Sequence, residues 1–220
     1  MDLRWVIAHR AWTSGYLIRY VRYLRIRFFR PDIELQGMVF IGRRVRFETR
    51  KGYGRIVIGP WVHIGDDNRL RCHEGTLSIG AKSVLGRDNT INCYLDVHIG
   101  SEVLISDWVY ICDFDHGTQD LDVAVRSQGL VKSPVRIGDG CWIGTKATIL
   151  RGSLVGEHSV IGAHAVVRGV IPTFSLAGGI PARVLRSRRA PRRRKLDTIS
   201  YHLSGAGRRL RRAPQWKGLT

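Results

Sequence analysis

Aliphatic residues recur at every sixth position along most of this chain. Fifteen positions fall on this lattice and all are aliphatic: Ile58, Ile64, Leu70, Ile79, Leu85, Ile91, Ile99, Ile105, Ile111, Ile137, Ile143, Ile149, Val155, Ile161 and Val167. The residues two places earlier are mostly small or aliphatic, as alternation along a strand requires of a second inward row. A repeat this short predicts a solenoid, because each copy buries its apolar face only by stacking on its neighbours.

Nine lattice residues are followed directly by glycine. We interpret this glycine as a corner, where a residue without Cβ takes backbone angles closed to others. The lattice is uninterrupted from Ile137 to Val167, but a few extra residues separate Leu70 from Ile79 and Ile91 from Ile99, and a long insertion spans 112–136. We expect these insertions to be loops at corners, where functional residues usually lie.

The pattern therefore predicts an all-β chain, a parallel β-helix of hexapeptide repeats with additions at both ends. We divide it into a basic, aromatic N-terminal helix over 1–30, a β-helix over 31–172 with the long loop at 112–136, and a C-terminal segment with an Arg-rich tail over 173–220. No run of eighteen apolar residues and no signal peptide is found, so we expect a cytoplasmic protein.

The formal net charge of +18 is concentrated at the two ends of the chain. Residues 1–30 carry +6 and residues 184–220 carry +11, whereas 31–183 carry only +1. The N-terminal helix is expected to cap the open end of the solenoid or to contact an anionic membrane surface, which would place the protein at the inner face of the membrane. The basic tail attracts phosphates in general, and no accompanying motif indicates specific nucleic-acid recognition.

The four cysteines, Cys72, Cys93, Cys112 and Cys141, form no CxxC pair. We expect reduced and mostly buried thiols rather than a disulfide framework or a zinc site.

Several motifs stand in one register: Ile91-Asn92-Cys93, Asp115-His116-Gly117, Cys141-Trp142-Ile143-Gly144 and Gly179-Ile180-Pro181-Ala182-Arg183. In this order they resemble the hexapeptide-repeat acyltransferases, and in particular the maltose, galactoside and polysaccharide O-acetyltransferases, over about residues 55–186. The resemblance implies a left-handed β-helix that forms a homotrimer with sites between subunits. It also implies transfer from acetyl-CoA, or another short acyl-CoA, to a hydroxyl of a saccharide or glycolipid, with no metal.

His116 matches the general base of that family, and histidine has a pKa suited to deprotonating an alcohol. Asp113, Asp115 and Asp120 flank it, and the sequence leaves open which of them orients the ring. The family commonly has Asn where Asp115 stands, and we include Asp115 among the catalytic candidates. The backbone N–H of Thr145 corresponds to the donor that stabilises the oxyanion.

The resemblance assigns Asn92, Trp142 and Asp113 to the acceptor. For Asn92 the alternative is an inward-stacking ladder, and for Trp142 it is packing at a corner. Contacts with coenzyme A are expected from Thr145, Ala163, Arg168, Arg183 and Arg186, although Arg168 and its neighbour Gly169 depart from the Thr-Lys pair common in the family.

Two other functional classes use the same architecture. A γ-type zinc carbonic anhydrase needs three convergent histidines, but Ile111 and Leu121 stand five residues before and after His116. His158 and His164 are six apart and are expected to face solvent. A non-catalytic scaffold or glycan-binding solenoid is the other alternative, and the histidine loop argues against it.

Overall fold

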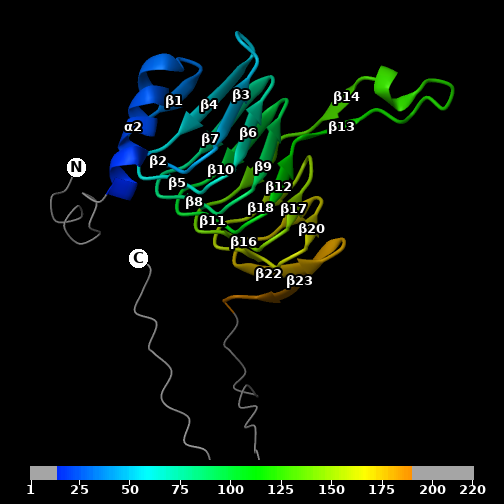
Figure 1. Ribbon diagram of the computed structural model, residues 1–220. Helices are drawn as coiled ribbons and strands as arrows, with labels where there is room; N and C mark the ends of the chain where they lie inside the picture. Colours follow the sequence, from blue (N-terminus) through cyan, green and yellow to red (C-terminus); the bar gives the residue numbers. More distant parts are fainter. Residues whose placement is uncertain (1–13, 190–220) are drawn as a thin grey trace, which may run out of the picture. The chain divides into compact units, whose positions relative to one another are not determined.

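The computed structural model describes residues 14–189, which form one helix followed by a three-sided parallel solenoid (Figure 1). We number the three sheets in the order in which the chain enters them. Sheet I contains β1 (Ile33–Leu35), β4 (Gly54–Ile58), β7 (Gly75–Ile79), β10 (Asp96–Ile99), β15 (Val135–Ile137), β18 (Leu154–Val155) and β21 (Val170–Ile171). Sheet II contains β2 (Phe40–Ile41), β5 (His63–Ile64), β8 (Val84–Leu85), β11 (Leu104–Ile105), β16 (Trp142–Ile143), β19 (Val160–Ile161), β22 (Ser175–Gly179) and β23 (Ala182–Ser187). Sheet III contains β3 (Arg46–Thr49), β6 (Arg69–Cys72), β9 (Thr90–Cys93), β12 (Tyr110–Cys112), β17 (Thr148–Ile149) and β20 (Val166–Val167).

Both predicted inward rows are confirmed. Every lattice residue is at most 2% exposed, and the row two positions earlier is buried as well. Neighbouring coils pair in register, so that Ile105 lies opposite Ile143 and Ile111 opposite Ile149. Aliphatic side chains, most of them similar in size, therefore stack along the axis of the prism, which gives the coils one continuous apolar core.

Our explanation of the corner glycines is wrong. Positive φ falls two residues after them, for example at Asp67 (64°) and Lys146 (58°). A Cβ on Gly59 would lie 2.7 Å from the backbone nitrogen of Ala81, and one on Gly144 equally close to a backbone nitrogen of the next coil. Glycine is needed here because the next coil passes too close for a side chain, not because the backbone angles exclude one.

All the extra residues of the coils gather at one corner, between sheets III and I, which we call the arm corner. They are residues 50–53, 73–74 and 94–95, followed by the long insertion. That insertion projects from the solenoid as an antiparallel pair, β13 (Phe114–His116) with β14 (Leu130–Lys132), joined through a short 3-10 helix, Val125–Ser127 (Figure 1). We call residues 113–134 the arm. The insertion thus lies at a corner, as predicted, and it is a β-hairpin.

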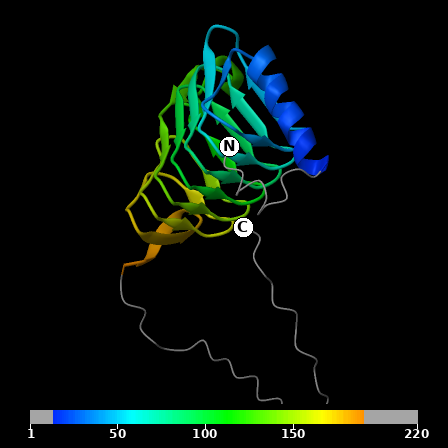
Figure 2. The ribbon, with the colours of Figure 1, turned by 90° about the vertical axis from the view of Figure 1, so that its left-hand side faces the viewer.

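The helix α2 (Ser14–Phe29) covers the first coil and packs against β1 and β2 (Figure 2). Phe40 of β2 is fully buried, and its ring centroid lies 5.7 Å from that of Tyr16 and 6.4 Å from that of Tyr20. At the other end, β23 folds back antiparallel on β22. The start of the expected N-terminal helix, residues 1–13, and the Arg-rich tail, residues 190–220, lie outside the described residues. No helix between residues 14 and 189 is long and apolar enough to cross a membrane.

Candidate active site

Aromatic rings from successive coils stack at the arm corner and continue into the arm. The ring centroids of His73 and Tyr94 are 4.6 Å apart, and those of Tyr94 and Phe114 are 4.4 Å apart. The ring of His116 follows, 6.5 Å from that of Phe114. Since such contacts stabilise a defined ring geometry, the stack holds the foot of the arm in place while His116 itself stays exposed.

Polar contacts brace the same corner. The carboxylate of Asp113 is fully buried and accepts three backbone N–H groups, those of residues 94–96, at 2.8 Å each. Lys132 on the returning strand β14 pairs with Glu74, and this pairing lowers the pKa of the Glu74 carboxyl. Asp113 therefore has a structural role at the corner, and its predicted contact with the acceptor stays a prediction.

Asp115 and His116 are neighbours on β13, so their side chains leave opposite faces of the strand. Oδ2 of Asp115 lies 2.5 Å from Nε of Arg151 in the next coil. Asp120 lies further along the arm, where its carboxylate accepts the N–H of Asp122 at 3.0 Å. Within residues 14–189 neither of these two carboxylates hydrogen-bonds to His116, so the residue that orients its ring stays unassigned.

Asn92 faces outward on β9, directly opposite Cys112 at the foot of the arm. Its Nδ2 donates to the hydroxyl of Tyr110 at 3.1 Å, whereas its Oδ1 is buried with no partner among the described residues. The alternative of an inward ladder is therefore wrong for Asn92; Asn68 and Asn89 form that ladder. A buried acceptor without a partner is rare in folded proteins, which makes the Asn92 carbonyl a candidate contact for a bound hydroxyl.

Trp142 lies within β16 on the outer face of sheet II, so it does not pack at a corner. It is 48% exposed, and its Nε1 donates to the hydroxyl of Ser106 at 3.1 Å. Its neighbours on the adjoining strands are Leu104 and Val160. Trp142 is therefore available to a groove or a partner subunit, as the acceptor assignment requires.

Thr145 lies at the corner between sheets II and III, in register with Ala163 of the next coil. In two other coils of this corner the equivalent backbone N–H donates to a carboxylate of the next coil: that of Arg43 to Asp66 at 2.8 Å, and that of Arg87 to Asp107 at 2.7 Å. The methyl side chain of Ala163 offers no such acceptor. The N–H of Thr145 is thus left without a side-chain acceptor from that coil, which is the arrangement that an oxyanion donor needs.

Three arginines expected to meet coenzyme A are exposed. Arg168 follows β20 at the arm corner, whereas Arg183 and Arg186 lie on β23 in sheet II. Within the part of the chain that the structure describes, none of the three forms an ion pair with a carboxylate. Their guanidinium groups are therefore available to phosphate.

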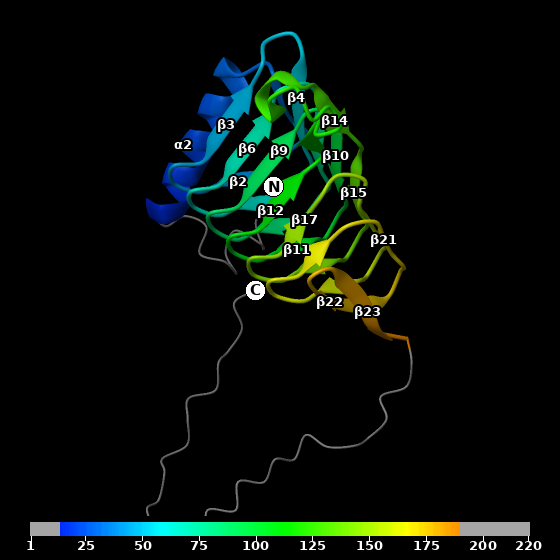
Figure 3. The same cartoon turned by 90° about the vertical axis from the view of Figure 1, so that its right-hand side faces the viewer.

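The predicted site residues next to sheet III fall into two groups, at opposite ends of its strands. Figure 3 looks onto this sheet, with the arm at one edge. His116 and Arg168 lie at the arm corner, where the strands end, and Asn92 lies within β9 close to that end. Thr145 and Ala163 lie at the corner where the strands begin. One chain therefore does not bring the predicted base and the predicted oxyanion donor together.

Residues 134–169 match a model of protein families described as "Bacterial transferase hexapeptide (six repeats)". This segment of the chain resembles bacterial transferase hexapeptide repeats. The match includes the uninterrupted part of the lattice and contains Trp142, Thr145, Ala163 and Arg168.

Curated relatives of this hexapeptide-repeat chain are named as acetyltransferases. "Probable acetyltransferase Rv3034c" of Mycobacterium tuberculosis is 52% identical over 187 residues, which are 85% of this chain and 62% of that protein. WbbJ of Escherichia coli K12, named for lipopolysaccharide biosynthesis O-acetyl transfer, is 34% identical over 97 residues, which are 41% of this chain and 50% of WbbJ. The chain thus spans less than two thirds of the length of either relative.

Solved structures show the same fold. Galactoside acetyltransferase in complex with coenzyme A matches with a TM-score of 0.52 and 21% identity, covering 80% of this chain and 84% of that one. A mutant of AntD, an N-acyltransferase from Bacillus cereus in complex with dTDP and coenzyme A, matches with a TM-score of 0.64 and 18% identity, covering 77% and 89%. The expected left-handed parallel β-helix is confirmed.

The hexapeptide-repeat domain also carries an open groove that our sequence analysis did not single out. It lies on sheet I beside the arm and has a volume of about 650 Å³. Its lining combines apolar surface with several polar groups. The hydroxyl of Ser78 lies 2.8 Å from Nδ1 of His98, and Asp96 forms an ion pair with Arg136. These residues are outward positions of strands that border the insertion, which is the signal that could have identified them.

The four cysteines of the domain are buried free thiols, as expected. Burial raises the pKa of Cys112 and of Cys141, so both thiols are held in the neutral form. Among residues 14–189, no group of three His, Cys, Asp or Glu side chains is placed to hold a metal ion.

Proposed function

We propose that this chain is an acyl-CoA-dependent O-acyltransferase that acylates a saccharide hydroxyl, with His116 as its general base. The observation that carries this proposal is the position of His116, exposed on an arm whose foot is braced by a ring stack and by Asp113. A general base must be open to substrate and also held in place, and the arm corner meets both requirements. The unpaired carbonyl of Asn92 beside the arm adds an acceptor for a sugar hydroxyl.

In the proposed reaction, His116 takes the proton of the acceptor hydroxyl as the hydroxyl oxygen attacks the thioester carbonyl. A C–O bond forms, and the carbonyl oxygen becomes an oxyanion that accepts a hydrogen bond from the N–H of Thr145. Collapse of this intermediate breaks the C–S bond. The imidazolium returns its proton to the leaving thiolate, so the products are the ester and free coenzyme A.

This mechanism requires a second copy of the chain, because sheet III separates His116 from Thr145. We therefore propose a homotrimer in which the arm of one subunit meets the Thr145 corner of its neighbour. The outer face of sheet II supports this, since Val84, Leu104 and Trp142 form an exposed column that a neighbouring copy would cover.

The proposed co-substrate is acetyl-CoA or another short acyl-CoA, which places the reaction in the cytoplasm. Arg168, Arg183 and Arg186 would bind its phosphates, and Ala163 would leave room for its pantetheine arm. A saccharide acceptor is supported by the name of WbbJ and by the polar side chains that line part of the groove on sheet I.

The test is thiol release from acetyl-CoA over a panel of sugars and glycolipids. His116→Ala should lower acceptor-dependent release by about two orders of magnitude or more, the usual scale for losing a general base. His158→Ala serves as the matched control, because His158 is an exposed corner histidine away from the arm. Equal thiol release by the wild type and His116→Ala would refute the assignment of His116 as general base. No thiol release with any acceptor or donor would favour a scaffold or glycan-binding solenoid.

Mixing two inactive variants tests the shared site. His116→Ala and Thr145→Pro, which lacks the N–H, would be refolded together. If each site takes its base from one subunit and its oxyanion donor from another, random trimers regain about a quarter of the wild-type rate. If the mixture stays as inactive as its two components, the proposal of a site between subunits fails.

A further inference from the structure

The outward face of α2 carries an apolar stripe that no described part of the chain covers. Its six large side chains are between 47% and 77% exposed: Leu17, Ile18, Val21, Leu24, Phe28 and Phe29. On the other face of the helix, Tyr23 and Ile26 pack against the solenoid core. A helix that is apolar on both faces buries one against its own domain and presents the other to a second environment.

The positive charge of α2 indicates what kind of second environment its outward face meets. The helix contains Arg19, Arg22, Arg25 and Arg27 and has no Asp or Glu. Arg25 lies within the exposed face, between the turns that carry Val21 and Phe28. An apolar stripe bordered only by cations is typical of helices that lie in the interface of an anionic bilayer.

A pocket of about 410 Å³ lies between the C-terminal half of α2 and the first coil. Four arginines line it, namely Arg22, Arg25, Arg30 and Arg44. Phe29 belongs both to the lining of this pocket and to the exposed stripe. The basic pocket and the apolar stripe therefore form one continuous surface.

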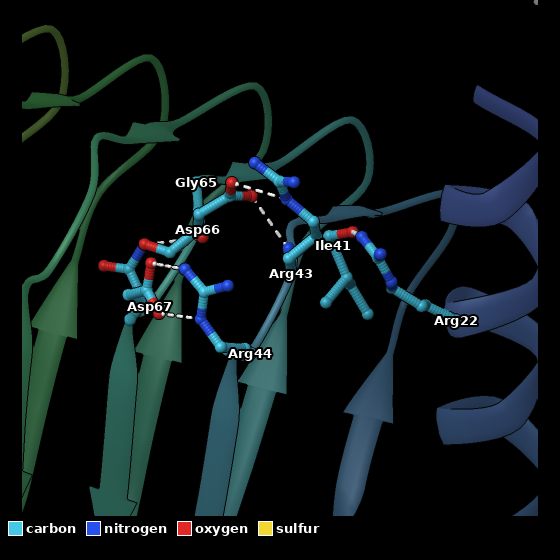
Figure 4. A network of polar contacts seen from close by, with 8 residues as sticks. Arg22, Ile41, Arg43, Arg44, Gly65, Asp66 and Asp67 are labelled. Atoms are coloured by element: carbon cyan, nitrogen blue, oxygen red, sulfur yellow. Dashed lines mark hydrogen bonds and ion pairs between the residues drawn. The ribbon is translucent and has the colours of Figure 1, made fainter. Parts of the chain in front are cut away.

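Two of the four arginines are neutralised by carboxylates. Arg44 donates to both carboxylate oxygens of Asp67, at 2.6 and 2.7 Å (Figure 4). Arg30 lies 2.6 Å from Asp32, and this hydrogen bond is the main reason why the pKa of Asp32 is lowered to about 2. Both carboxylates therefore stay ionised at neutral pH, and these two pairs add no net charge to the pocket.

The other two arginines remain uncompensated. Arg22 reaches from α2 to the first coil, where it donates to the carbonyl of Ile41 at 3.2 Å (Figure 4). Neither Arg22 nor Arg25 has a carboxylate partner within residues 14–189. The pocket therefore presents two positive charges beside apolar surface, which fits the phosphate and the adjoining acyl chain of an anionic lipid.

The two ends of the chain do not supply the missing negative charge. Residues 1–13 contain Arg4 and Arg10 against Asp2, and residues 184–220 carry +11. A second copy of α2 packed on the first would bring arginines against arginines, which is unfavourable. Charge complementarity therefore favours an anionic partner over either end of this chain or its own copy.

We propose that α2 docks this protein on anionic membranes, with the stripe inserted at the headgroup boundary and a lipid phosphate held by Arg22 and Arg25. This docking surface lies on the first coil, on the side of the solenoid opposite the arm (Figure 1). It does not depend on the proposed acyl transfer and can be tested without an enzyme assay.

The test is flotation of the full chain with vesicles of phosphatidylcholine alone, or with phosphatidylglycerol added at about three parts in ten. The wild type should float with the anionic vesicles and remain unbound with the neutral ones. Val21→Ser with Phe28→Ser keeps the charge and removes apolar area, and Arg22→Gln with Arg25→Gln removes two charges beside the pocket. Each pair should weaken binding to anionic vesicles about tenfold or more.

The matched control is Arg208→Gln with Arg209→Gln, which removes the same charge from the C-terminal tail. This variant should bind at least threefold more tightly than Arg22→Gln with Arg25→Gln. Equal loss in the two charge variants would show general attraction of a basic chain and overturn the proposal. The proposal would also be overturned if the Val21→Ser, Phe28→Ser variant bound anionic vesicles as tightly as the wild type. It would be overturned as well if that variant formed a smaller oligomer than the wild type, because the stripe would then be a contact between copies of the chain. Unchanged thermal unfolding would confirm that the variants fold.

Discussion

The inward rows of the solenoid and the arm corner belong to the same coils but are built in different ways. Inside, aliphatic residues recur at the same position from coil to coil, and each lattice side chain meets an apolar side chain in the adjoining coils. At the arm corner different kinds of group meet. Stacked rings, a buried carboxylate and an ion pair, contributed by successive coils and by the arm, contact one another there.

This difference explains where the chemistry lies. The interior is lined mostly by aliphatic side chains and is closed to solvent, so it stabilises the fold and offers no accessible polar group to a substrate. The arm corner interrupts the lattice, and this leaves an exposed histidine and an unpaired amide carbonyl outside the core. The two regions should therefore respond differently to substitution, the interior through stability and the corner through activity.

The largest effect is expected inside the prism. Ile99→Asp places a carboxylate where the side chain is fully buried, stacked between Ile79 and Ile137. An unpaired buried charge costs several kcal/mol or more, so we expect no folded protein in a circular dichroism and gel-filtration assay. His98→Asp, one residue earlier on the same strand but exposed, should fold normally. A soluble, cooperative Ile99→Asp protein would contradict the account of the interior.

The next effect tests the brace of the arm. Asp113→Asn replaces a carboxylate that accepts three backbone N–H groups with an amide that can accept from only one side. We expect a loss of about 2–3 kcal/mol in the free energy of unfolding, measured by urea denaturation. Asp120→Asn, an exposed carboxylate further along the arm, should change it by no more than about 0.5 kcal/mol. Equal effects in the two variants would show that Asp113 does not brace the corner.

A smaller effect on stability, but a clear one on turnover, is expected at the ring stack. Tyr94→Ala removes the ring between His73 and Phe114, so the arm is held less firmly. We expect kcat to fall about tenfold and the KM for acyl-CoA to stay nearly unchanged. The substitution would disturb the position of His116 but not the binding of acyl-CoA. Tyr94→Phe keeps the stack and should restore most of kcat. If Tyr94→Phe were as slow as Tyr94→Ala, the hydroxyl rather than the ring would matter.

The interior could be predicted from the sequence because burial follows a period. Ile58 and Ile161 occupy equivalent positions, and the six-residue spacing alone places both side chains inward. The same rule, applied strictly, would have turned Asn92 outward, since it directly follows the lattice residue Ile91. The corner glycines could not be explained in this way, because the spacing between coils is not a property of one strand.

The position of the arm was also predictable, since the lattice breaks there. The contacts that hold the foot of the arm in place were not predictable. His73, Tyr94 and Phe114 are about twenty residues apart in sequence, and they meet only because the slips of the lattice fall at the same corner. A pattern of hydrophobic positions does not reveal such contacts between outward side chains. The separation of His116 from Thr145 likewise follows from which corner each one occupies, which becomes visible only when the sheets are assigned.

The smallest effect is expected where the arm meets the next coil. Asp115 and Arg151 form an ion pair at 2.5 Å, with the Asp115 side chain 48% exposed to solvent. Exposed pairs contribute about 1 kcal/mol or less, so a double-mutant cycle with Asp115→Asn and Arg151→Gln should give a coupling energy below about 1 kcal/mol. Because Asp115 leaves β13 on the face opposite His116, we expect kcat to change by less than about threefold. If Asp115→Asn lowered kcat a hundredfold and Arg151→Gln left kcat unchanged, Asp115 would instead be the carboxylate that orients His116. In that case the arm would have to rearrange when subunits assemble.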